Sequence, residues 1–281
     1  MFGKTPTPGI KPSIQSLAVA PCDGLTLGFD SGRPPFGSHD LGGGDERPLL
    51  VDPPREFIRL RRQLGSMLLV LENEVDRDKR YFVPEITRHL PEYRVHDVAH
   101  GDVPAVADLV DLVDGVVLSG STAGVYESSD YPWMDDLRYL VSDLVAHELP
   151  TLGVCFGHQL VNDALGGTVE HRGLTAELVD VDFADDPLFE GVASTVPMVH
   201  GDHVTDLGDG MEPIASADYY PFPASRHENA PLWTVQYHPE FTDRLLPRIA
   251  ADFDWQGSRD FSAVSVERTF ANFVRLAGSG V

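Results

Sequence analysis

The sequence of 281 residues predicts an α/β protein with an open, mostly parallel twisted sheet and helices on both faces. From Met67 onwards, short apolar runs suited to buried strands alternate with stretches that have helical spacing. Strands separated by helices in this way favour parallel pairing, with the helices covering both faces of the sheet. The chain is 42% hydrophobic and 23% charged, which is the ordinary balance of a globular protein.

The predicted elements follow one another closely along the chain. Apolar or alternating runs predict strands at residues 67–71, 93–98, 115–118 and 151–154. Between them, helical spacing predicts helices at residues 79–90, 103–113, 132–148 and 156–165. The clearest is the helix at 132–148, where one stripe carries Trp133, Leu137, Leu140, Val141, Leu144 and Val145. Later strands are predicted at 168–171, 177–183, 196–199, 214–217 and 233–237, before a last helix at 265–276.

The first part of the chain differs in composition from the rest. Residues 1–54 hold nine glycines and nine prolines, a third of that stretch, and show no sustained period of a strand or helix. We therefore expect residues 1–66 to be a disordered, Gly/Pro-rich leader and residues 67–281 to form one domain.

Composition also excludes several classes of protein. No stretch approaches the roughly 18 consecutive apolar residues that a membrane-spanning helix needs, and no apolar segment of a secretory signal follows the N-terminal lysines. The two cysteines, Cys22 and Cys155, cannot form a disulfide framework, so we expect a reducing, cytoplasmic location. The net charge of −23 argues against a nucleic-acid partner, because phosphate binding needs clustered cations.

The acidic surface indicates adaptation to high salt. The chain has 29 Asp and 15 Glu but only three Lys beside 18 Arg. At molar salt the Debye length falls to about 3 Å, so repulsion between carboxylates is screened while their hydration maintains solubility. An acidic protein from an ordinary cytoplasm remains the alternative.

We expect the free energy of unfolding to rise as KCl is added, because screening relieves repulsion in the folded state. Thermal unfolding measured from low to molar KCl checks this expectation. Full stability without added salt would contradict a halophilic origin.

The segment 151–159 has the pattern of a nucleophile elbow. An apolar strand runs into Cys155, glycines stand two residues before and after it, and a helix starts at once. The glycines allow the backbone to approach the nucleophile closely. The helix N-terminus favours a thiolate at Cys155, and the Phe156 N–H points to where an oxyanion would develop. A buried structural cysteine is the alternative.

A second segment, Val-Gln-Tyr-His-Pro-Glu at 235–240, supplies a matching base. Pro239 excludes a helix here and favours an extended backbone at His238. Residues two apart in an extended chain face the same side, so His238 and Glu240 can point together. A carboxylate beside an imidazole fixes its tautomer and holds it as a base toward a thiol. A solvated loop histidine is the alternative, which the upstream elbow disfavours.

Three segments together resemble the class I glutamine amidotransferases, the family with a Cys-His-Glu triad. They are Gly-Val-Cys-Phe-Gly-His-Gln at 153–159, the segment at 235–240, and Val-Leu-Ser-Gly-Ser-Thr-Ala-Gly-Val-Tyr-Glu at 117–127. They stand in the family's order and spacing, and the resemblance covers about residues 67–276. The first strand lacks the patterns of true synthase glutaminase units, so the chain looks most similar to stand-alone, GMP-synthase-like members. The resemblance implies their flavodoxin-like fold.

The resemblance implies a glutaminase in which Cys155 attacks the side-chain amide of glutamine, His238 moves protons and Glu240 orients His238. A γ-glutamyl thioester forms, ammonia is released, and water hydrolyses the thioester. No cofactor or metal is implied for this half-reaction. The 281 residues contain no Gly-x-x-x-x-Gly-Lys loop for ATP, so an ammonia-accepting synthase is expected as a partner.

The resemblance also assigns oxyanion- and substrate-binding positions, which are Gly120, Ser121, Phe156, Gln159, Gly201 and Asp202. This chain departs from the family at two of the matching places. Leu-Ser-Gly-Gly-Pro reads Leu-Ser-Gly-Ser-Thr here, so Ser121 must form its turn without the freedom of glycine. Val199 stands where the family often has Ser or Asn.

Other interpretations stay open at this point. The same triad would serve a free-standing γ-glutamyl hydrolase or peptidase, and a non-catalytic module could have kept the fold. His200 and His203 beside Asp202 could suggest a metal site, but no further well-placed ligand follows from the sequence. We therefore interpret this segment as a substrate-side loop.

Overall fold

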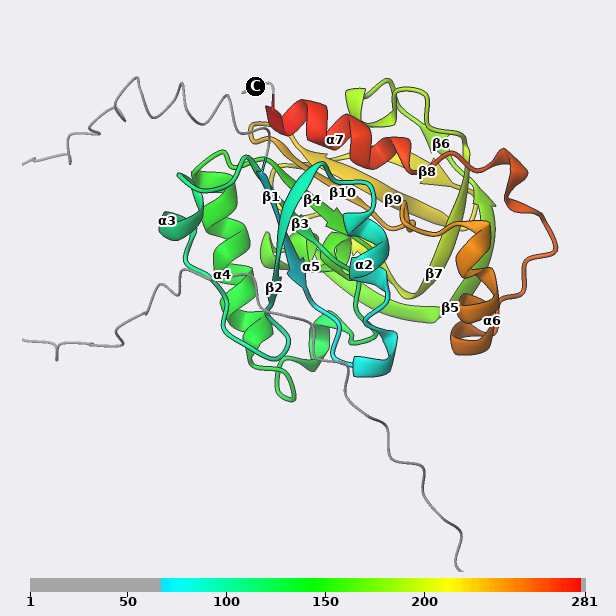
Figure 1. The fold of residues 1–281 in the computed structure, drawn as a ribbon, viewed down its shortest axis with the longest axis horizontal. Coiled ribbons are helices and arrows are strands. Elements are labelled where there is room, and N and C mark those ends of the chain that lie inside the picture. Colours follow the sequence, from blue (N-terminus) through cyan, green and yellow to red (C-terminus); the bar gives the residue numbers. More distant parts are fainter. Residues whose placement is uncertain (1–66, 279–281) are drawn as a thin grey trace, which may run out of the picture. The chain divides into compact units, whose positions relative to one another are not determined.

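A computed structural model describes residues 67–278, and the predicted leader at 1–66 lies outside the described residues. Its main sheet has eight strands in the order β2-β1-β3-β4-β10-β9-β8-β6 (Figure 1). The first five strands are parallel and the last three are antiparallel. In sheet order, their bounds are Glu92–Asp97, Met67–Glu72, Gly115–Leu118, Thr151–Val154, Leu232–Val235, Tyr220–His227, Met211–Ala217 and Asp182–Phe183.

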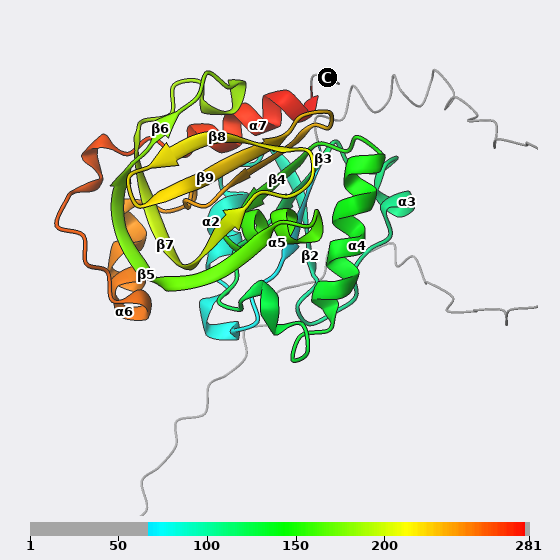
Figure 2. The same ribbon diagram turned by 180° about the vertical axis from the view of Figure 1, so that it is seen from behind.

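Helices cover both faces of this sheet, as predicted (Figures 1 and 2). Successive side chains of β1 point to opposite faces of the sheet and so belong to two different cores. Leu68 and Val70 share a core with α2 (Phe82–Thr87) and α7 (Arg268–Gly278). Leu69 and Leu71 contribute to the opposite core, formed with α3 (Val106–Leu109), α4 (Trp133–Ala146) and α5 (Phe156–Ala164). No helix among residues 67–278 has the length and apolar character needed to cross a membrane.

A two-stranded antiparallel ribbon, β5 (Thr168–Asp180) with β7 (Thr195–Asp206), accompanies the sheet (Figure 2). The predicted strand at 168–171 and most of the one at 177–183 belong to one long β5, whose pairing with β7 shifts between His171 and Thr175. β7 is much longer than the predicted 196–199. Its polar half, which includes His200 and Asp202, carries no apolar pattern but pairs with β5 through the backbone.

Several elements differ from prediction for identifiable reasons. The helix predicted at 79–90 is a 3-10 turn, η1 (Arg77–Lys79), followed by the short α2, and the one predicted at 103–113 is reduced to α3. The sequence pattern does not predict β9, because Pro221 and Pro223 are typical strand breakers. β9 nevertheless pairs with both β8 and β10. Nor does the pattern predict the helix α6 (Leu246–Phe253), since only Ile249 of its residues is buried.

The topology brings distant segments to one edge of the sheet. Strands β1, β3, β4 and β10 are consecutive neighbours and run parallel, so their carboxyl ends lie at the same edge. The turn at Gly120, the elbow at Cys155 and the segment containing His238 follow β3, β4 and β10 in turn. This edge is where open α/β sheets hold their ligands.

Candidate active site

Cys155 sits in a strained backbone conformation between β4 and α5. Its φ of 52° and ψ of −104° place a residue with a side chain in a region that favours glycine. The Cys155 N–H donates to the carbonyl of Val235 at 2.9 Å, which fixes the strand end against β10. Such strain persists only where the surrounding structure enforces it, and it concentrates at functional sites.

The two glycines beside Cys155 are required by the closeness of the backbone. A Cβ on Gly153 would lie 2.6 Å from the carbonyl oxygen of Gly157, and a Cβ on Gly157 would lie 2.5 Å from that of Leu118. Because these neighbours are backbone atoms of the elbow and of β3, they cannot move aside cheaply. The tight turn therefore depends on glycine at both places.

We expect Gly157→Ala to lower the free energy of unfolding by at least about 2 kcal/mol, because the added Cβ overpacks the elbow against β3. Gly120→Ala is a matched control, since its Cβ would make ordinary contacts of 3.5 Å to His238 and 3.6 Å to Cys155. Chemical denaturation of both variants gives the comparison. Equal stabilities would contradict the steric explanation of the elbow.

His238 and Glu240 form a buried pair directly after β10. The Nδ1 atom of His238 lies 2.8 Å from Oε1 of Glu240, and the two side chains are 2% and 0% exposed. The His238 N–H donates to the carbonyl of Pro197 at 3.0 Å. The ring of Phe241 stacks on the imidazole with centroids 4.1 Å apart. These contacts fix both the position of the imidazole and the plane of its ring.

The thiol of Cys155 and the imidazole of His238 both lie close to the carbonyl oxygen of Val199. Sγ of Cys155 lies 3.7 Å from this oxygen, and Nε2 of His238 lies 3.3 Å from it. Gly120 lies close to both side chains, since a Cβ added to it would be 3.5 Å from His238 and 3.6 Å from Cys155. Val199 contributes through its backbone, so the absence of a Ser or Asn side chain there does not remove this contact.

The surroundings of His238 favour its charged form. Burial lowers the pKa of the imidazole, but the charges of Cys155 and Glu240 and their hydrogen bonds outweigh burial and raise that pKa to about 10. A protonated imidazole beside Cys155 is the arrangement that stabilises a thiolate. Because the folded pKa lies above the unfolded value, this charge stabilises the fold fully below about pH 6.5 and the contribution is lost as pH rises through about 10.

Glu240→Gln is expected to lower the pKa of His238 by roughly one unit or more, because it removes a buried negative charge. An NMR titration of ¹⁵N-labelled histidines measures this value, with the His238 signal identified by its loss in His238→Asn. Glu228→Gln, which changes an exposed carboxylate, is the control and leaves the titration in place. An unchanged pKa of His238 in Glu240→Gln would show that this carboxylate does not stabilise the protonated imidazole.

A cavity of about 270 Å³ opens beside the thiol. Six predicted site residues line it: Ser121, Cys155, Gln159, Gly201, Asp202 and His238. Gly120 lies close to Cys155 and His238, Phe156 follows Cys155 directly, and Glu240 is hydrogen-bonded to His238. The structure thus brings all nine predicted residues to one place.

One wall of the cavity is polar and preorganised. The amide nitrogen of Gln159 donates to the backbone carbonyl of Asp202 and to Oε1 of Gln236, both at 3.2 Å. The Asp202 carboxylate accepts a hydrogen bond from the Tyr126 hydroxyl at 3.3 Å, and its oxygen lies 2.9 Å from Nδ1 of His171. This wall therefore presents an anion whose position is fixed from two sides.

The cavity is also lined by groups that the sequence did not indicate. Lys79 lines the cavity together with Phe253, and its Nζ lies 5.2 Å from the centre of that ring. Lys79 is the only lysine among residues 67–278, since the other two lysines of the sequence are Lys4 and Lys11. The only hint in the sequence is the rarity of lysine itself.

The remaining histidines near the site are held by structural hydrogen bonds. Burial lowers the pKa of His158 and of His200 to about 3 in each case, so both are neutral. His158 contacts Thr234 at 2.7 Å and the Tyr220 hydroxyl at 2.9 Å, and Nε2 of His200 lies 2.8 Å from the Tyr219 hydroxyl. Within residues 67–278, no cluster of His, Cys, Asp and Glu has the arrangement of a metal site.

Comparison with known proteins gives concordant results. The family model "Glutamine amidotransferase class-I" matches residues 86–254. The chain is 33% identical over 177 residues to a glutamine-hydrolysing GMP synthase of Yarrowia lipolytica. This alignment covers 59% of this chain and 32% of that protein. It is 35% identical over 171 residues to the GMP synthase of Thermotoga maritima, covering 57% of this chain and 32% of that one. The chain thus spans about a third of the length of these relatives.

Solved structures share the fold. A putative GMP synthase protein from Thermoplasma acidophilum aligns with a TM-score of 0.57 at 21% identity, over 77% of this chain and 96% of that one. A glutamine amidotransferase from Thermotoga maritima aligns with a TM-score of 0.59 at 18% identity, over 76% and 98% of the two chains.

Proposed function

The chain belongs to the glutamine amidotransferase class-I family, and we propose that it hydrolyses the side-chain amide of glutamine and releases ammonia. The observation that carries this proposal is the strained Cys155 at a helix start, in contact with a buried imidazole that is itself paired with Glu240. This combination supplies a nucleophile, a proton carrier and an orienting carboxylate.

The proposed reaction has two halves. The Cys155 thiolate attacks the amide carbon of glutamine, and the tetrahedral intermediate collapses as the C–N bond breaks and His238 gives its proton to the leaving ammonia. The resulting γ-glutamyl thioester is attacked by water, whose proton passes to His238. Glutamate leaves and the thiolate–imidazolium pair is restored. Glu240 keeps the imidazole in one orientation throughout.

The oxyanion of each tetrahedral intermediate needs donors close to Cys155. We assign the backbone N–H groups of Phe156 and of the turn at Gly120 and Ser121 to this role. Phe156 is the first residue of α5, where N–H groups have no partner within the helix. The turn faces Cys155 from β3.

Two charged residues that line the cavity fit the amino-acid end of glutamine. The Asp202 carboxylate, held by Tyr126 and His171, suits the α-ammonium group, and Lys79 suits the α-carboxylate. This assignment limits substrates to γ-glutamyl compounds with both charges present.

We also propose that a synthase accepts the ammonia, because the relatives are glutamine-hydrolysing GMP synthases that are about three times as long as the matched region. The chemistry of the acceptor follows from that partner and not from the cavity. A free-standing γ-glutamyl hydrolase would use the same residues, and the experiment below separates the two.

The function is tested with the full chain at high KCl, by following glutamate and ammonia release from glutamine. Glutamine is expected to be turned over faster than γ-glutamylmethylamide, whose larger leaving group must also fit the cavity. Faster cleavage of the substituted amide would favour the hydrolase, and no cleavage of either would refute the proposal. Decarboxylated glutamine, 4-aminobutanamide, is expected to react poorly because it cannot engage Lys79.

A further inference from the structure

We propose that Glu74 is a positioning residue that fixes the turn at Gly120–Thr122 and, through it, the backbone N–H groups that hold the oxyanion. This inference rests on the proposed glutaminase function. Glu74 follows β1, which pairs with β3 so that Leu71 lies beside Leu118. The residues that follow the two strands are therefore neighbours at the catalytic edge of the sheet.

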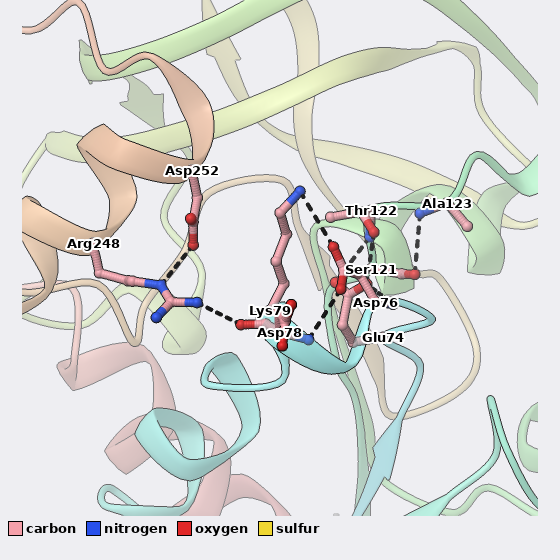
Figure 3. A network of polar contacts seen from close by, with 9 residues as sticks. All are labelled: Glu74, Asp76, Asp78, Lys79, Ser121, Thr122, Ala123, Arg248 and Asp252. Atoms are coloured by element: carbon pink, nitrogen blue, oxygen red, sulfur yellow. Dashed lines mark hydrogen bonds and ion pairs between the residues drawn. The ribbon is translucent and has the colours of Figure 1, made fainter. Parts of the chain in front are cut away.

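The contacts of Glu74 are directed at the turn (Figure 3). Its Oε2 accepts the Thr122 N–H at 3.0 Å, and its Oε1 accepts the Thr122 hydroxyl at 2.6 Å. Oε1 also accepts the Asp76 N–H at 2.7 Å, which fixes the carboxylate from its own side. The residue is 1% exposed, so water does not compete for these bonds. Both oxygens of one buried carboxylate thus hold a single residue of the turn.

The sequence of the turn explains why such a contact is needed. Where the pattern of the resembling family has Gly-Pro, whose proline restricts the backbone, this chain has Ser121 and Thr122. Ser121 needs no glycine-like conformation, since the residues with side chains and positive φ within 67–278 are Glu148, Cys155 and Asp254. Its hydroxyl accepts the Ala123 N–H at 3.2 Å. Side-chain hydrogen bonds therefore shape the turn in place of a proline ring.

A second contact fixes the residue that enters the turn. The Asn73 N–H donates to Oγ of Ser119 at 3.0 Å, and the Asn73 side chain donates to the Ser119 carbonyl at 2.9 Å. Ser119 is thus held independently of Glu74. Loss of Glu74 is expected to loosen the turn itself while leaving β1 paired with β3.

Burial raises the pKa of Glu74, although its bonds to Thr122 and Asp76 oppose this effect. A buried carboxylate is costly, and it is retained where donors satisfy both oxygens. Gln at this position keeps the size but offers only one acceptor oxygen, so it cannot accept the N–H groups of Thr122 and Asp76 at both of the present oxygen positions, and at least one of these bonds is lost.

Glu74→Gln is expected to lower kcat for glutamine by about 10- to 100-fold, which is less than the roughly 10²- to 10³-fold loss caused by removing one oxyanion donor, because the donors remain and only their positioning is weakened. KM is expected to change less than about twofold, because the turn acts on the transition state. Alkylation of Cys155 by iodoacetamide forms no oxyanion, so its rate is expected to stay near that of the parent. The measurements use a Cys22→Ser background, so that Cys155 is the reporting thiol.

A purely structural role would give a different result. Equal losses in kcat and in alkylation, or an unchanged kcat, would overturn the proposal. Should Glu74→Gln fail to fold, Thr122→Val removes only the hydroxyl donor and is expected to lower kcat severalfold, whereas Thr122→Ser retains it and is expected to match the parent. Equal kcat in these two variants would also overturn it. If the parent protein itself did not hydrolyse glutamine, the proposed function would fail instead.

Discussion

Replacing Cys155 by alanine is expected to reduce glutamine hydrolysis by at least about 10⁴-fold, because the covalent route disappears with the nucleophile. Alanine carries the same Cβ as cysteine, so the positive φ at this position is no more strained in the variant than in the parent protein. Cys155→Ala should therefore fold and bind glutamine through the unchanged cavity walls. Steady-state assays give the loss in rate, and calorimetric titration shows whether glutamine still binds.

Cys22→Ser is the matched control, because it removes the other cysteine of the chain. Its activity should equal that of the parent protein. Residual activity above a few per cent in Cys155→Ala would exclude this thiol as the nucleophile and favour a water-mediated hydrolysis.

His238→Asn is expected to lower kcat by about 10³-fold, because the imidazole beside Cys155 is the group that we assign to pass a proton to the leaving ammonia. The alkylation rate of Cys155 should fall as well, since the imidazolium that stabilises the thiolate is lost. This second effect separates His238 from Glu74, whose replacement is expected to leave alkylation unchanged.

His147→Asn provides the comparison for His238→Asn, since His147 is exposed after the end of α4. It should behave like the parent protein in both assays. If His238→Asn kept more than about a tenth of the activity, the proton transfer would have to be assigned to another group.

Much of the fold could be predicted because its parallel strands are short, continuous apolar runs. β1, β3 and β4 were found within a residue or two, since both faces of each are buried. Sequence patterns do not predict β9, which contains Pro221 and Pro223, or the polar half of β7, whose side chains show no apolar alternation. The family likeness inferred from three short segments is confirmed by the family model over residues 86–254.

The proposed triad residues could be predicted from the sequence because their local backbone leaves a recognisable pattern. Glycines around Cys155 and Pro239 beside His238 indicate backbone shapes that few other functions require. Glu74 could not be found this way, since its role depends on β1 lying next to β3. Lys79 likewise reaches the cavity through the short η1 turn, in a region where a longer helix was predicted.

In the proposed reaction, the sulfur of Cys155 attacks the carbon that carries the amide of glutamine. The most direct measurement treats the protein with 6-diazo-5-oxo-L-norleucine, a diazoketone analogue of glutamine, and locates the adduct by peptide mass spectrometry. We predict one adduct per chain, on Cys155, formed in parallel with inactivation and prevented by glutamine. Complete inactivation with Cys155 unmodified would contradict the account.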